Sequence, residues 1–374
     1  MTKSIDLPGG TRRFRNMIVA QQHKIEIPLK KILVIQLGDI GDVVWGIPAY
    51  RSVKAAFPQA ELFVLTREPN GDILLDEPYI AGVFQTKKNF PAALRLLREL
   101  RRLRLDLAID LRSDDRGAFT SFFSRAKMRA ALFYPGLFRR NHLFTHLVVD
   151  PPPEKERVFG AAGQSLKIIR GLGIKAENTA PQITVSPEAQ RRVGEIISGE
   201  KIQAGNGWVS INPFSRWTYK EWGEEKWGQL LAFIWRQYGL PALIIGSETE
   251  RERAVNLLRN FSSPAYNLAG KTLLREMPAL LKSSRLHIGV DSAAPHIAAA
   301  VGTPTVTIYG PSDWRDWAPP GVKNKVVLPE MSCSPCYQKG CAGSGRSLCL
   351  ENIAAQEVQR AAAQVLDGIL SPAT

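Results

Sequence analysis

Short runs of β-branched and other apolar residues alternate with amphipathic helical segments along nearly the whole chain. This alternation is typical of a parallel sheet wrapped by helices, because parallel neighbours are joined by long crossover connections that are usually helical. In the first half, the pattern predicts strands over Lys31–Gln36, Glu61–Thr66 and Leu105–Asp110, and helices over Pro48–Phe57 and through Phe90, Leu94, Leu97 and Leu100.

The same cycle starts again in the second half, after a proline- and glycine-containing segment, Thr179–Gly207, that reads as a linker around one helix. The expected elements are a strand over Trp208–Asn212, a helix over Glu224–Tyr238, a strand over Ala242–Ile245, a helix after Glu250, a strand over Arg285–Val290, a helix from Ala293 and a strand over Thr305–Tyr309. We therefore expect an α/β protein with two doubly wound halves. The length of 374 residues allows each half its own core.

Composition excludes several classes of protein. Hydrophobic residues make up 44% and charged residues 22% of the chain, which argues against a disordered, collagen-like or coiled-coil protein. No stretch approaches the roughly 20 apolar residues of a membrane-spanning helix. Residues 1–30 hold no continuous apolar core that would mark a secretory signal, so we expect a cytoplasmic protein.

The formal net charge is +14, which predicts a polyanionic partner such as nucleic acid, an anionic membrane face or a phosphorylated substrate. Half of this charge falls between residues 95 and 140, a segment that contains twelve basic and five acidic residues. The basic residues are Arg95, Arg98, Arg101, Arg102, Arg104, Arg112, Arg116, Arg125, Lys127, Arg129, Arg139 and Arg140. This cluster could be a solvated helix face, but we favour the interpretation that it forms a localised anion-binding surface.

A glycine-rich segment, Gln36–Pro48, directly follows the first predicted strand. Its glycines allow a tight turn at the carboxyl end of a strand, which is where open α/β sheets bind ligands. It does not match the dinucleotide fingerprint GxGxxG. The segment offers two carboxylates, Asp39 and Asp42, although an aspartate at a helix start is usually an N-cap.

Two further segments follow predicted strands of the second half. The loop Asn212–Trp227 carries Ser215, Thr218, Arg216 and Lys220, a set that suits a phosphate group. Its three tryptophans could stack on a ring or simply pack in the core; they are Trp217, Trp222 and Trp227.

The segment Ile288–Ala300 leads from a strand into a helix, whose N-terminus is a ready anion site. Asp291 and His296 invite a catalytic-pair interpretation. From the residues alone we favour the simpler one, in which Asp291 caps the helix and His296 forms a hydrogen bond within the turn.

All four cysteines fall within 17 residues, at Cys333, Cys336, Cys341 and Cys349. The first pair has the CxxC spacing of a zinc site, but the second pair is separated by seven residues, which weakens that interpretation. Free or packed thiols are the favoured alternative, because stable disulfides are rare in cytoplasmic proteins.

Taken together, these segments resemble the lipopolysaccharide heptosyltransferases, the ADP-heptose-dependent glycosyltransferase family 9. The resemblance rests on LGDIGDVVWGIPA, KEWGEEKW, GVDSAAPHIAAAVGTPTVTIYGPSD and CSPCYQKGC, and it covers the chain in order from Lys31 onward. It implies a GT-B architecture, with two Rossmann-like domains facing a central cleft. The implied divisions are a basic extension (1–30), an acceptor domain (31–190), a nucleotide-sugar domain (191–355) and a last helix (356–374) that packs back on the first domain.

The resemblance also implies roles for individual residues. Asp42 matches the general base that removes the acceptor hydroxyl's proton, and Lys220 matches the lysine that neutralises the ADP leaving group. Gly41, Arg112 and Arg116 fall where the family handles its acidic acceptor. The donor site would comprise Ser215, Arg216, Lys220, Gly246, Asp291, Ser292, Ala293 and His296. Arg216 departs from the hydroxyl residues common there, and Ser292-Ala293 replaces the more frequent Thr-Gly.

The implied reaction is a single inverting displacement that moves heptose from ADP-heptose to a hydroxyl of the lipopolysaccharide inner core. Basic residues and a helix dipole can replace a metal ion at the diphosphate, so neither a metal nor another cofactor is expected. The acidic acceptor sits on an anionic membrane face, and residues 10–31 with the 95–140 cluster could attach the protein to the inner membrane peripherally.

Three classes of rival function remain open at this level. One is another GT-B nucleotide-sugar enzyme, which would either use a different donor or be an epimerase that needs no acceptor. A transferase-like binding protein would have lost activity, although Asp42 and Lys220 are both present. Nucleic-acid binding is suggested only by charge, since the chain has no recognisable nucleic-acid-binding motif.

Overall fold

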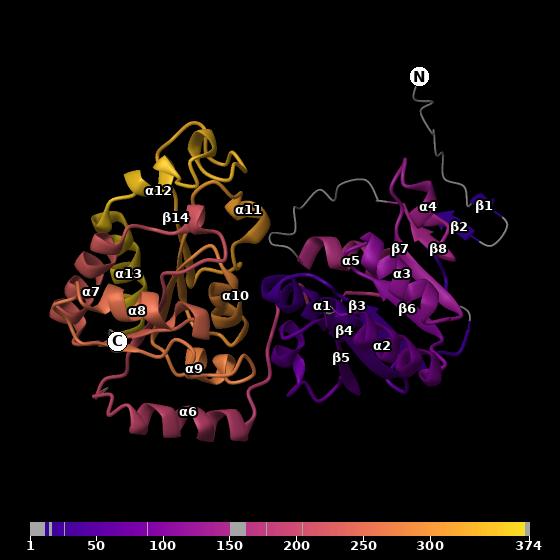
Figure 1. Cartoon of the computed structure of the whole chain (residues 1–374), viewed down its shortest axis with the longest axis horizontal. Helices are drawn as coiled ribbons and strands as arrows, with labels where there is room; N and C mark the ends of the chain where they lie inside the picture. Colours follow the sequence, from indigo (N-terminus) through magenta and orange to yellow (C-terminus); the bar gives the residue numbers. More distant parts are fainter. Residues whose placement is uncertain are drawn as a thin grey trace. The chain divides into compact units, whose positions relative to one another are not determined.

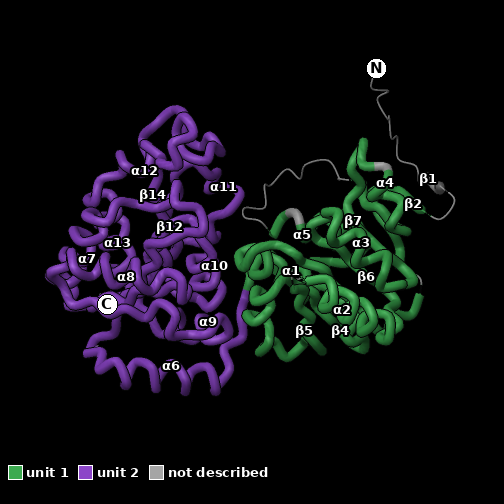
Figure 2. Tube along the Cα trace, in the orientation of Figure 1, with its two compact units in different colours: residues 1–181 green, residues 182–374 purple. Residues whose placement is uncertain are grey.

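The structure, a computed structural model, describes residues 12–14, 17–25, 27–87, 89–149, 162–176, 178–203 and 205–370. The chain divides into two compact units, Met1–Pro181 and Gln182–Thr374 (Figure 2). Each unit is built on one sheet with helices along both of its faces (Figure 1), so the predicted α/β class is confirmed. None of the helices in the described part of the chain is long and apolar enough to cross a bilayer.

The sheet of the first unit has the strand order β1-β2-β8-β7-β6-β3-β4-β5 among the described residues, and only the β1–β2 pair is antiparallel. Its strands are β1 (Arg12–Phe14), β2 (Met17–Ala20), β3 (Lys31–Ile35), β4 (Glu61–Arg67), β5 (Gly82–Thr86), β6 (Leu107–Asp110), β7 (Met128–Leu132) and β8 (His146–Val148). Its helices are α1 (Ile40–Ala56), the 3₁₀ helix η1 (Asn70–Leu74), α2 (Phe90–Leu103), α3 (Asp115–Phe123), α4 (Phe138–Asn141) and α5 (Ala162–Gly171).

The central strand β3 is buried on both faces. Leu33 and Ile35 point into one cluster with Leu96 and Leu100 of α2, because alternate residues of a strand share a face. On the other side of the sheet, α1 packs along α5, with Trp45 in contact with a cluster that includes Leu166. These two layers hold the carboxyl end of β3, and the loop that follows it, in place.

Helix α1 begins at Ile40, whereas the sequence pattern predicted a start at Pro48. Asp39 is the extended N-cap residue, and its backbone N–H donates to the carboxylate of Asp42. Pro48 therefore lies inside the helix, where Ser52 donates its hydroxyl to the Pro48 carbonyl. Burial of the apolar residues before Pro48 favours the helix despite the missing N–H.

Part of the predicted N-terminal extension belongs to the sheet, whereas residues 1–11 lie outside the described residues. Strand β2 pairs with β8 in parallel, and Met17 and Val19 are buried against Phe144 and Leu147. The alternation of these apolar residues explains the difference, because a half-buried strand places every second side chain in the core.

The sheet of the second unit is parallel, with the order β11-β10-β9-β12-β13-β14 among the described residues. Its strands are β9 (Val209–Asn212), β10 (Ala242–Ile244), β11 (Ala265–Asn267), β12 (Leu286–Val290), β13 (Thr305–Ile308) and β14 (Asn324–Val327). Its α-helices are α6 (Pro187–Gly199), α7 (Glu224–Tyr238), α8 (Arg251–Leu258), α9 (Met277–Lys282), α10 (Ala293–Ala300), α11 (Trp314–Trp317), α12 (Leu348–Asn352) and α13 (Ala355–Leu370). Its 3₁₀ helices are η2 (Thr218–Lys220), η3 (Glu248–Glu250) and η4 (Cys341–Gly343).

The last helix, α13, packs against the core of the second unit. Val358, Ala362 and Leu366 are fully buried in one cluster with Trp227 and Leu230 of α7. The boundary between the units also falls at residue 181, nine residues before the expected one, so the whole of α6 belongs to the second unit.

Candidate active site

In the first unit, Asp42 lies in the first turn of α1, just beyond the carboxyl end of β3. One of its carboxylate oxygens accepts the Asp39 backbone N–H at 2.8 Å and an Arg112 guanidinium N–H at 2.9 Å. The Asp42 side chain is 22% exposed, so it reaches solvent while its orientation is held from two sides. Asp42 thus caps the helix and also presents a carboxylate at the mouth of the sheet.

Burial raises the pKa of Asp42, and the nearby Arg112 guanidinium opposes this rise. A raised pKa brings a carboxylate closer to the range in which it can accept a proton from a reacting hydroxyl and release it again. The Arg112 guanidinium also orients the Asp42 carboxylate and favours its ionised form. This environment suits a general base.

Gly38 makes room for that carboxylate. A Cβ atom at position 38 would lie 2.4 Å from Cβ and Oδ2 of Asp42, closer than real contacts allow. The Gly38 carbonyl also accepts hydrogen bonds from Asn70 at 2.8 Å and from Arg67 at 3.2 Å. Arg67 forms an ion pair with Asp39 as well. These contacts from Arg67 and Asn70, at the end of β4 and in η1, therefore hold the turn in place.

A buried aspartate, Asp110, holds the loop that carries the predicted acceptor residues. Its Oδ1 accepts the backbone N–H groups of Arg112 at 3.2 Å and Ser113 at 3.0 Å. Arg112 thereby reaches Asp42, whereas Arg116 donates to Asp114 at 2.9 Å and to the Leu37 carbonyl at 3.4 Å. Burial raises the pKa of Asp110 to about 7. Gly41 lies beside Asp42 in the first turn of α1.

Sequence reasoning did not single out Arg67, Asn70 or the role of Asp110. Each acts through the backbone or through a second side chain, so no motif marks it. The only available signal was position, since β4 and β6 neighbour β3 and their carboxyl ends meet at one edge of the sheet.

In the second unit, Lys220 and Asp291 form an ion pair at 2.6 Å. Lys220 ends the 3₁₀ helix η2 in the loop after β9, and Asp291 directly follows β12, the neighbour of β9. Their side chains are 21% and 9% exposed. The structure thus brings together Lys220 and Asp291, two residues that the family resemblance places in the donor site.

The turn before α10 differs from the simpler interpretation of the sequence. Asp291 pairs with Lys220, and the N-cap residue of α10 is Ser292, whose hydroxyl donates to Asn212 Oδ1 at 2.8 Å. Asn212 in turn donates to the Ile245 carbonyl at 3.0 Å. With the side chains of Asp291 and Ser292 engaged elsewhere, the N–H groups from Ala293 onward remain a suitable anion site.

His296 is buried one turn into α10, close to the Lys220–Asp291 pair. Burial lowers its pKa to about 4; the Asp291 carboxylate opposes this shift and the Lys220 ammonium adds to it. The imidazole is therefore neutral near pH 7. Such a ring is a hydrogen-bonding group rather than a cation in this site.

The loop after β9 carries the other predicted donor residues. Ser215 is buried, and its backbone N–H donates to Glu221 at 2.9 Å. Arg216 is exposed and stacks on Trp217, with the guanidinium carbon 5.3 Å from the ring centroid. Trp222 and Trp227 instead pack in the core, which decides between the two interpretations of these tryptophans. Trp217 is 43% exposed.

Gly246 lies at the carboxyl end of β10, next to β9 in the sheet. A Cβ atom there would come within 2.8 Å of Glu250 Oε2. The predicted donor residues thus gather at the carboxyl ends of three adjacent strands, β10, β9 and β12.

Comparisons with known proteins identify the family. The family model described as glycosyltransferase family 9 (heptosyltransferase) matches residues 93–345, which is more than half of the chain. The chain belongs to glycosyltransferase family 9.

Two curated relatives and one solved structure illustrate the similarity. Lipopolysaccharide heptosyltransferase 3 from Escherichia coli is 26% identical over 74% of this chain and 84% of its own length. Lipopolysaccharide heptosyltransferase 2 from Salmonella typhimurium is 27% identical over 88% of this chain and 96% of its own length. The structure of E. coli ADP-heptose lps heptosyltransferase II matches 90% of this chain and 98% of its own, with a TM-score of 0.73 and 21% identity. This family 9 glycosyltransferase has the GT-B fold.

The cysteine segment of this family 9 enzyme lies against the β9–α7 loop. Ser347 donates to the Tyr219 carbonyl at 2.6 Å, and the Lys339 ammonium lies 5.6 Å from the centroid of the Trp217 ring. All four cysteines are free. Within the part of the chain that the structure describes, no group of three or more His, Cys, Asp or Glu side chains is placed to hold a metal ion. The structure therefore gives no support to the zinc interpretation.

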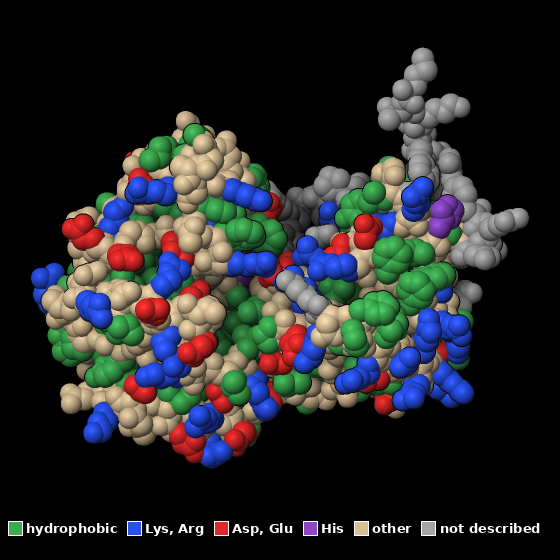
Figure 3. All heavy atoms as spheres, in the orientation of Figure 1, with side chains coloured by type: hydrophobic (Ala, Val, Ile, Leu, Met, Phe, Trp, Pro, Cys, Tyr) green, Lys and Arg blue, Asp and Glu red, His purple; other side chains and the backbone are tan. Residues whose placement is uncertain are grey.

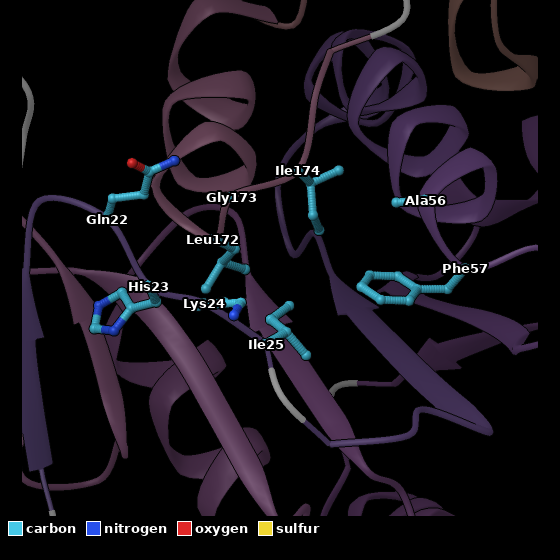
Figure 4. Close-up of a pocket in the computed structure, with 9 residues that line it drawn as sticks. All are labelled: Gln22, His23, Lys24, Ile25, Ala56, Phe57, Leu172, Gly173 and Ile174. Carbon is cyan, nitrogen blue, oxygen red and sulfur yellow. The ribbon is translucent and has the colours of Figure 1, made fainter.

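A pocket of about 580 Å³ opens elsewhere in the first unit (Figure 4). It is lined by Phe57 after α1, by Leu172–Ile174 after α5, and by Gln22–Ile25. Because Phe57 and Asp42 lie at opposite ends of the 17-residue α1, about 20 Å of helix separates this pocket from the candidate base. It is not part of the candidate active site.

Proposed function

We propose that this family 9 glycosyltransferase transfers heptose from ADP-heptose to a hydroxyl of the lipopolysaccharide inner core. The observation that carries the proposal is the half-buried Asp42 carboxylate, held at the carboxyl end of β3 by Arg112 and by the Asp39 N–H. The names of the relatives support the choice of sugar and acceptor, and the name of the similar solved structure supports ADP-heptose as donor.

The second unit would bind the donor. Lys220 would leave Asp291 and contact the diphosphate, where its charge would offset the negative charge that develops on the departing ADP. Asp291 would then be free to accept hydrogen bonds from sugar hydroxyls. The N–H groups at the start of α10 and the exposed Arg216 would add to the diphosphate site.

The first unit would bind the acceptor and activate its hydroxyl. In one displacement, the hydroxyl oxygen bonds to the anomeric carbon, the bond from that carbon to ADP breaks, and the hydroxyl proton passes to Asp42. A single displacement inverts the configuration at the anomeric carbon. Arg112 and Arg116 would contact acidic groups of the acceptor.

Because Lys220, Arg216 and the α10 N-terminus can supply positive charge to the diphosphate, the proposed reaction requires neither a metal ion nor another cofactor. The proposed acceptor is a glycolipid, so the enzyme would work on the anionic cytoplasmic face of the inner membrane. The net charge of +14 supports such a partner.

Calorimetric titration with ADP, UDP and GDP, each with and without a chelator, tests the donor half of the proposal. We expect selective, chelator-insensitive ADP binding that Lys220→Ala weakens at least tenfold. Lys127→Ala is the matched control, because Lys127 also forms a close ion pair, at 2.8 Å with Asp106, but belongs to the first unit, whereas the proposed donor site belongs to the second. A preference for UDP, or unchanged ADP binding by Lys220→Ala, would contradict the proposal. Release of an epimerised sugar without acceptor would indicate an epimerase instead.

A further inference from the structure

Three exposed phenylalanines form a patch on α3 of the first unit. Phe119, Phe122 and Phe123 are 54%, 43% and 40% exposed. Their rings are in contact, with centroid separations of 6.5 Å between Phe119 and Phe123 and 5.4 Å between Phe122 and Phe123. Single exposed apolar side chains are common on proteins, but a contiguous aromatic patch usually marks an interaction surface.

The neighbouring helix α2 extends this patch. Phe90, Leu94, Arg98 and Arg101 follow one another at helical spacing, so they share one face of α2. Phe90 is 75% and Leu94 is 39% exposed, and Arg101 donates to the Phe123 carbonyl at 2.8 Å, which joins this face to the end of α3. Hydrophobic side chains gather over α2 and α3 in Figure 3, bordered by Lys and Arg side chains.

Positive charge surrounds the aromatic residues. Exposed basic side chains lie on α2 and in the loop after α3, and Arg129 lies with its guanidinium carbon 5.7 Å from the centroid of the Phe122 ring. The exposed residues of this basic border are Arg95, Arg98, Arg101, Arg102, Arg104, Arg125 and Lys127. Phenylalanine and leucine set among lysine and arginine are typical of helices that lie in the interface of an anionic bilayer.

The patch also lies close to the proposed acceptor site. Helix α3 begins at Asp115, directly after the loop that carries Arg112. With a rise of 1.5 Å per residue, Phe119 lies about 6 Å along α3 from Asp115. The patch therefore begins near the acceptor loop and extends along α3 to Phe123, about 12 Å from Asp115.

We propose that the α2–α3 face, with Phe119, Phe122 and Phe123 at its centre, docks on the surface of an anionic lipid bilayer. The aromatic rings enter the boundary between headgroups and acyl chains, and the arginines contact lipid phosphates. The choice of membrane over other partners rests on the proposed function, since the acceptor is a glycolipid. A second copy of the chain fits less well, because a symmetric contact through this face would oppose two sets of arginines.

Co-sedimentation with lipid vesicles tests this proposal without any requirement for enzymatic activity. The probes are vesicles of phosphatidylcholine alone and vesicles that contain an equal part of phosphatidylglycerol. We expect the protein to bind the anionic vesicles, less strongly at high salt, and to bind phosphatidylcholine weakly. The variant F119S/F122S/F123S should lose at least tenfold in vesicle affinity. The control L273S/V322S replaces residues of the second unit that are 63% and 90% exposed and should bind as the wild type does.

A matched pair of charge variants separates specific docking from general attraction. R98E/R102E and R236E/R259E change the net charge equally, but the second pair lies on α7 and after α8 in the second unit. The proposal requires that only R98E/R102E weakens vesicle binding strongly; equal losses from both variants would overturn it.

Thermal melting of each variant and transfer to a lipid-free inner-core oligosaccharide complete the test. The melting temperature and the rate of transfer to this lipid-free acceptor should remain near wild type for F119S/F122S/F123S. This result distinguishes failed docking from a failed reaction. Vesicle binding unaffected by the phenylalanine variant would overturn the proposal. So would self-association in solution that this variant abolishes without a loss of vesicle binding.

Discussion

Asp39 and Asp42 lie three residues apart but in different surroundings. Asp39 is 56% exposed and pairs with Arg67, whereas Asp42 is 22% exposed and accepts hydrogen bonds from Arg112 and the Asp39 backbone. Burial raises the pKa of Asp42. We infer that these surroundings make Asp42 the carboxylate that acts as the base.

Asp42→Asn should therefore lower kcat by about two to four orders of magnitude, because the amide cannot accept the acceptor's proton. Its affinity for ADP should stay within about twofold of the wild type, since Asp42 belongs to the first unit and the proposed donor site to the second. Steady-state kinetics and calorimetry measure the two effects separately.

Asp39→Asn is the companion variant. It removes a carboxylate from the same turn but leaves Asp42 and Arg112 in place, so kcat should fall less than about tenfold. If Asp39→Asn abolished turnover while Asp42→Asn remained active, the assignment of the base would be wrong.

Residue motifs predicted positions in the site better than they predicted contacts. The sequence placed Asp42 and Asp291 just after strands and Lys220 in the loop between a strand and a helix, and each lies there. It did not predict the Lys220–Asp291 ion pair, because the two residues are 71 positions apart and meet only through the β9–β12 pairing. The same holds for Arg112, which reaches Asp42 across the β3–β6 pairing.

At the scale of elements, the turn between β3 and α1 depends on a close approach at Gly38. A Cβ atom there would lie 2.4 Å from the Asp42 side chain, so Gly38→Ala must displace that carboxylate. We expect kcat/KM to fall at least tenfold, with ADP affinity unchanged.

Gly194→Ala in α6 is the matched control, because a Cβ atom there meets nothing within 4 Å. This variant should be fully active and about 1 kcal/mol more stable, as expected for alanine in a helix. Wild-type kinetics for Gly38→Ala would show that the turn does not hold Asp42 as described.

The packing of α13 makes a separate prediction. Leu366 is fully buried in the core of the second unit, so Leu366→Ala should lower the unfolding free energy of that unit by about 3 kcal/mol. Ile369→Ala, at a 37% exposed position, should change it by less than about 0.5 kcal/mol. Hydrogen exchange resolved by peptide can compare the units. Loss of protection confined to the first unit would contradict the observed packing.

Sequence periodicity predicted the buried strands closely but not every helix boundary or partner. β3, β9 and β12 were located within one residue, because strands buried on both faces form continuous apolar runs between polar ends. The start of α1 was misplaced, since Pro48 resembles a helix start although burial keeps it inside the helix. The amphipathic pattern of α13 marked an apolar face but did not identify α7 as one of its partners.

At the scale of the whole molecule, the two units differ in the groups whose pKa values burial shifts. In the second unit, burial lowers the pKa of His287 to about 3 and of His296 to about 4. In the first unit, burial lowers the pKa of His23, and that of His146 to about 4, but it raises the pKa of Asp42, and that of Asp110 to about 7.

These shifts act in opposite directions on stability. A histidine with a lowered pKa does not penalise folding above about pH 6.5, but it destabilises the fold increasingly as pH falls from there toward its folded-state pKa. An aspartate with a raised pKa penalises folding above its folded-state pKa, and this penalty shrinks as pH falls toward 4. The two effects offset each other in the first unit and not in the second.

We therefore predict that the second unit is the more acid-sensitive one. At pH 5, His287 and His296 should each cost it about 2 kcal/mol relative to pH 7. Peptide-resolved hydrogen exchange at the two pH values should show the larger loss of protection in residues 182–370. His287→Gln should reduce that loss. A greater loss in the first unit would contradict these assignments.

Transfer itself is the most direct test of the proposed function. Purified protein would be incubated with ADP-heptose and a heptose-deficient inner-core acceptor, and the products analysed by mass spectrometry and for released ADP. We predict an acceptor heavier by one heptose, with one ADP released per transfer and almost no product from Asp42→Asn. An acceptor that stays unmodified with ADP-heptose but gains a sugar from a UDP- or GDP-linked donor would contradict the proposed function.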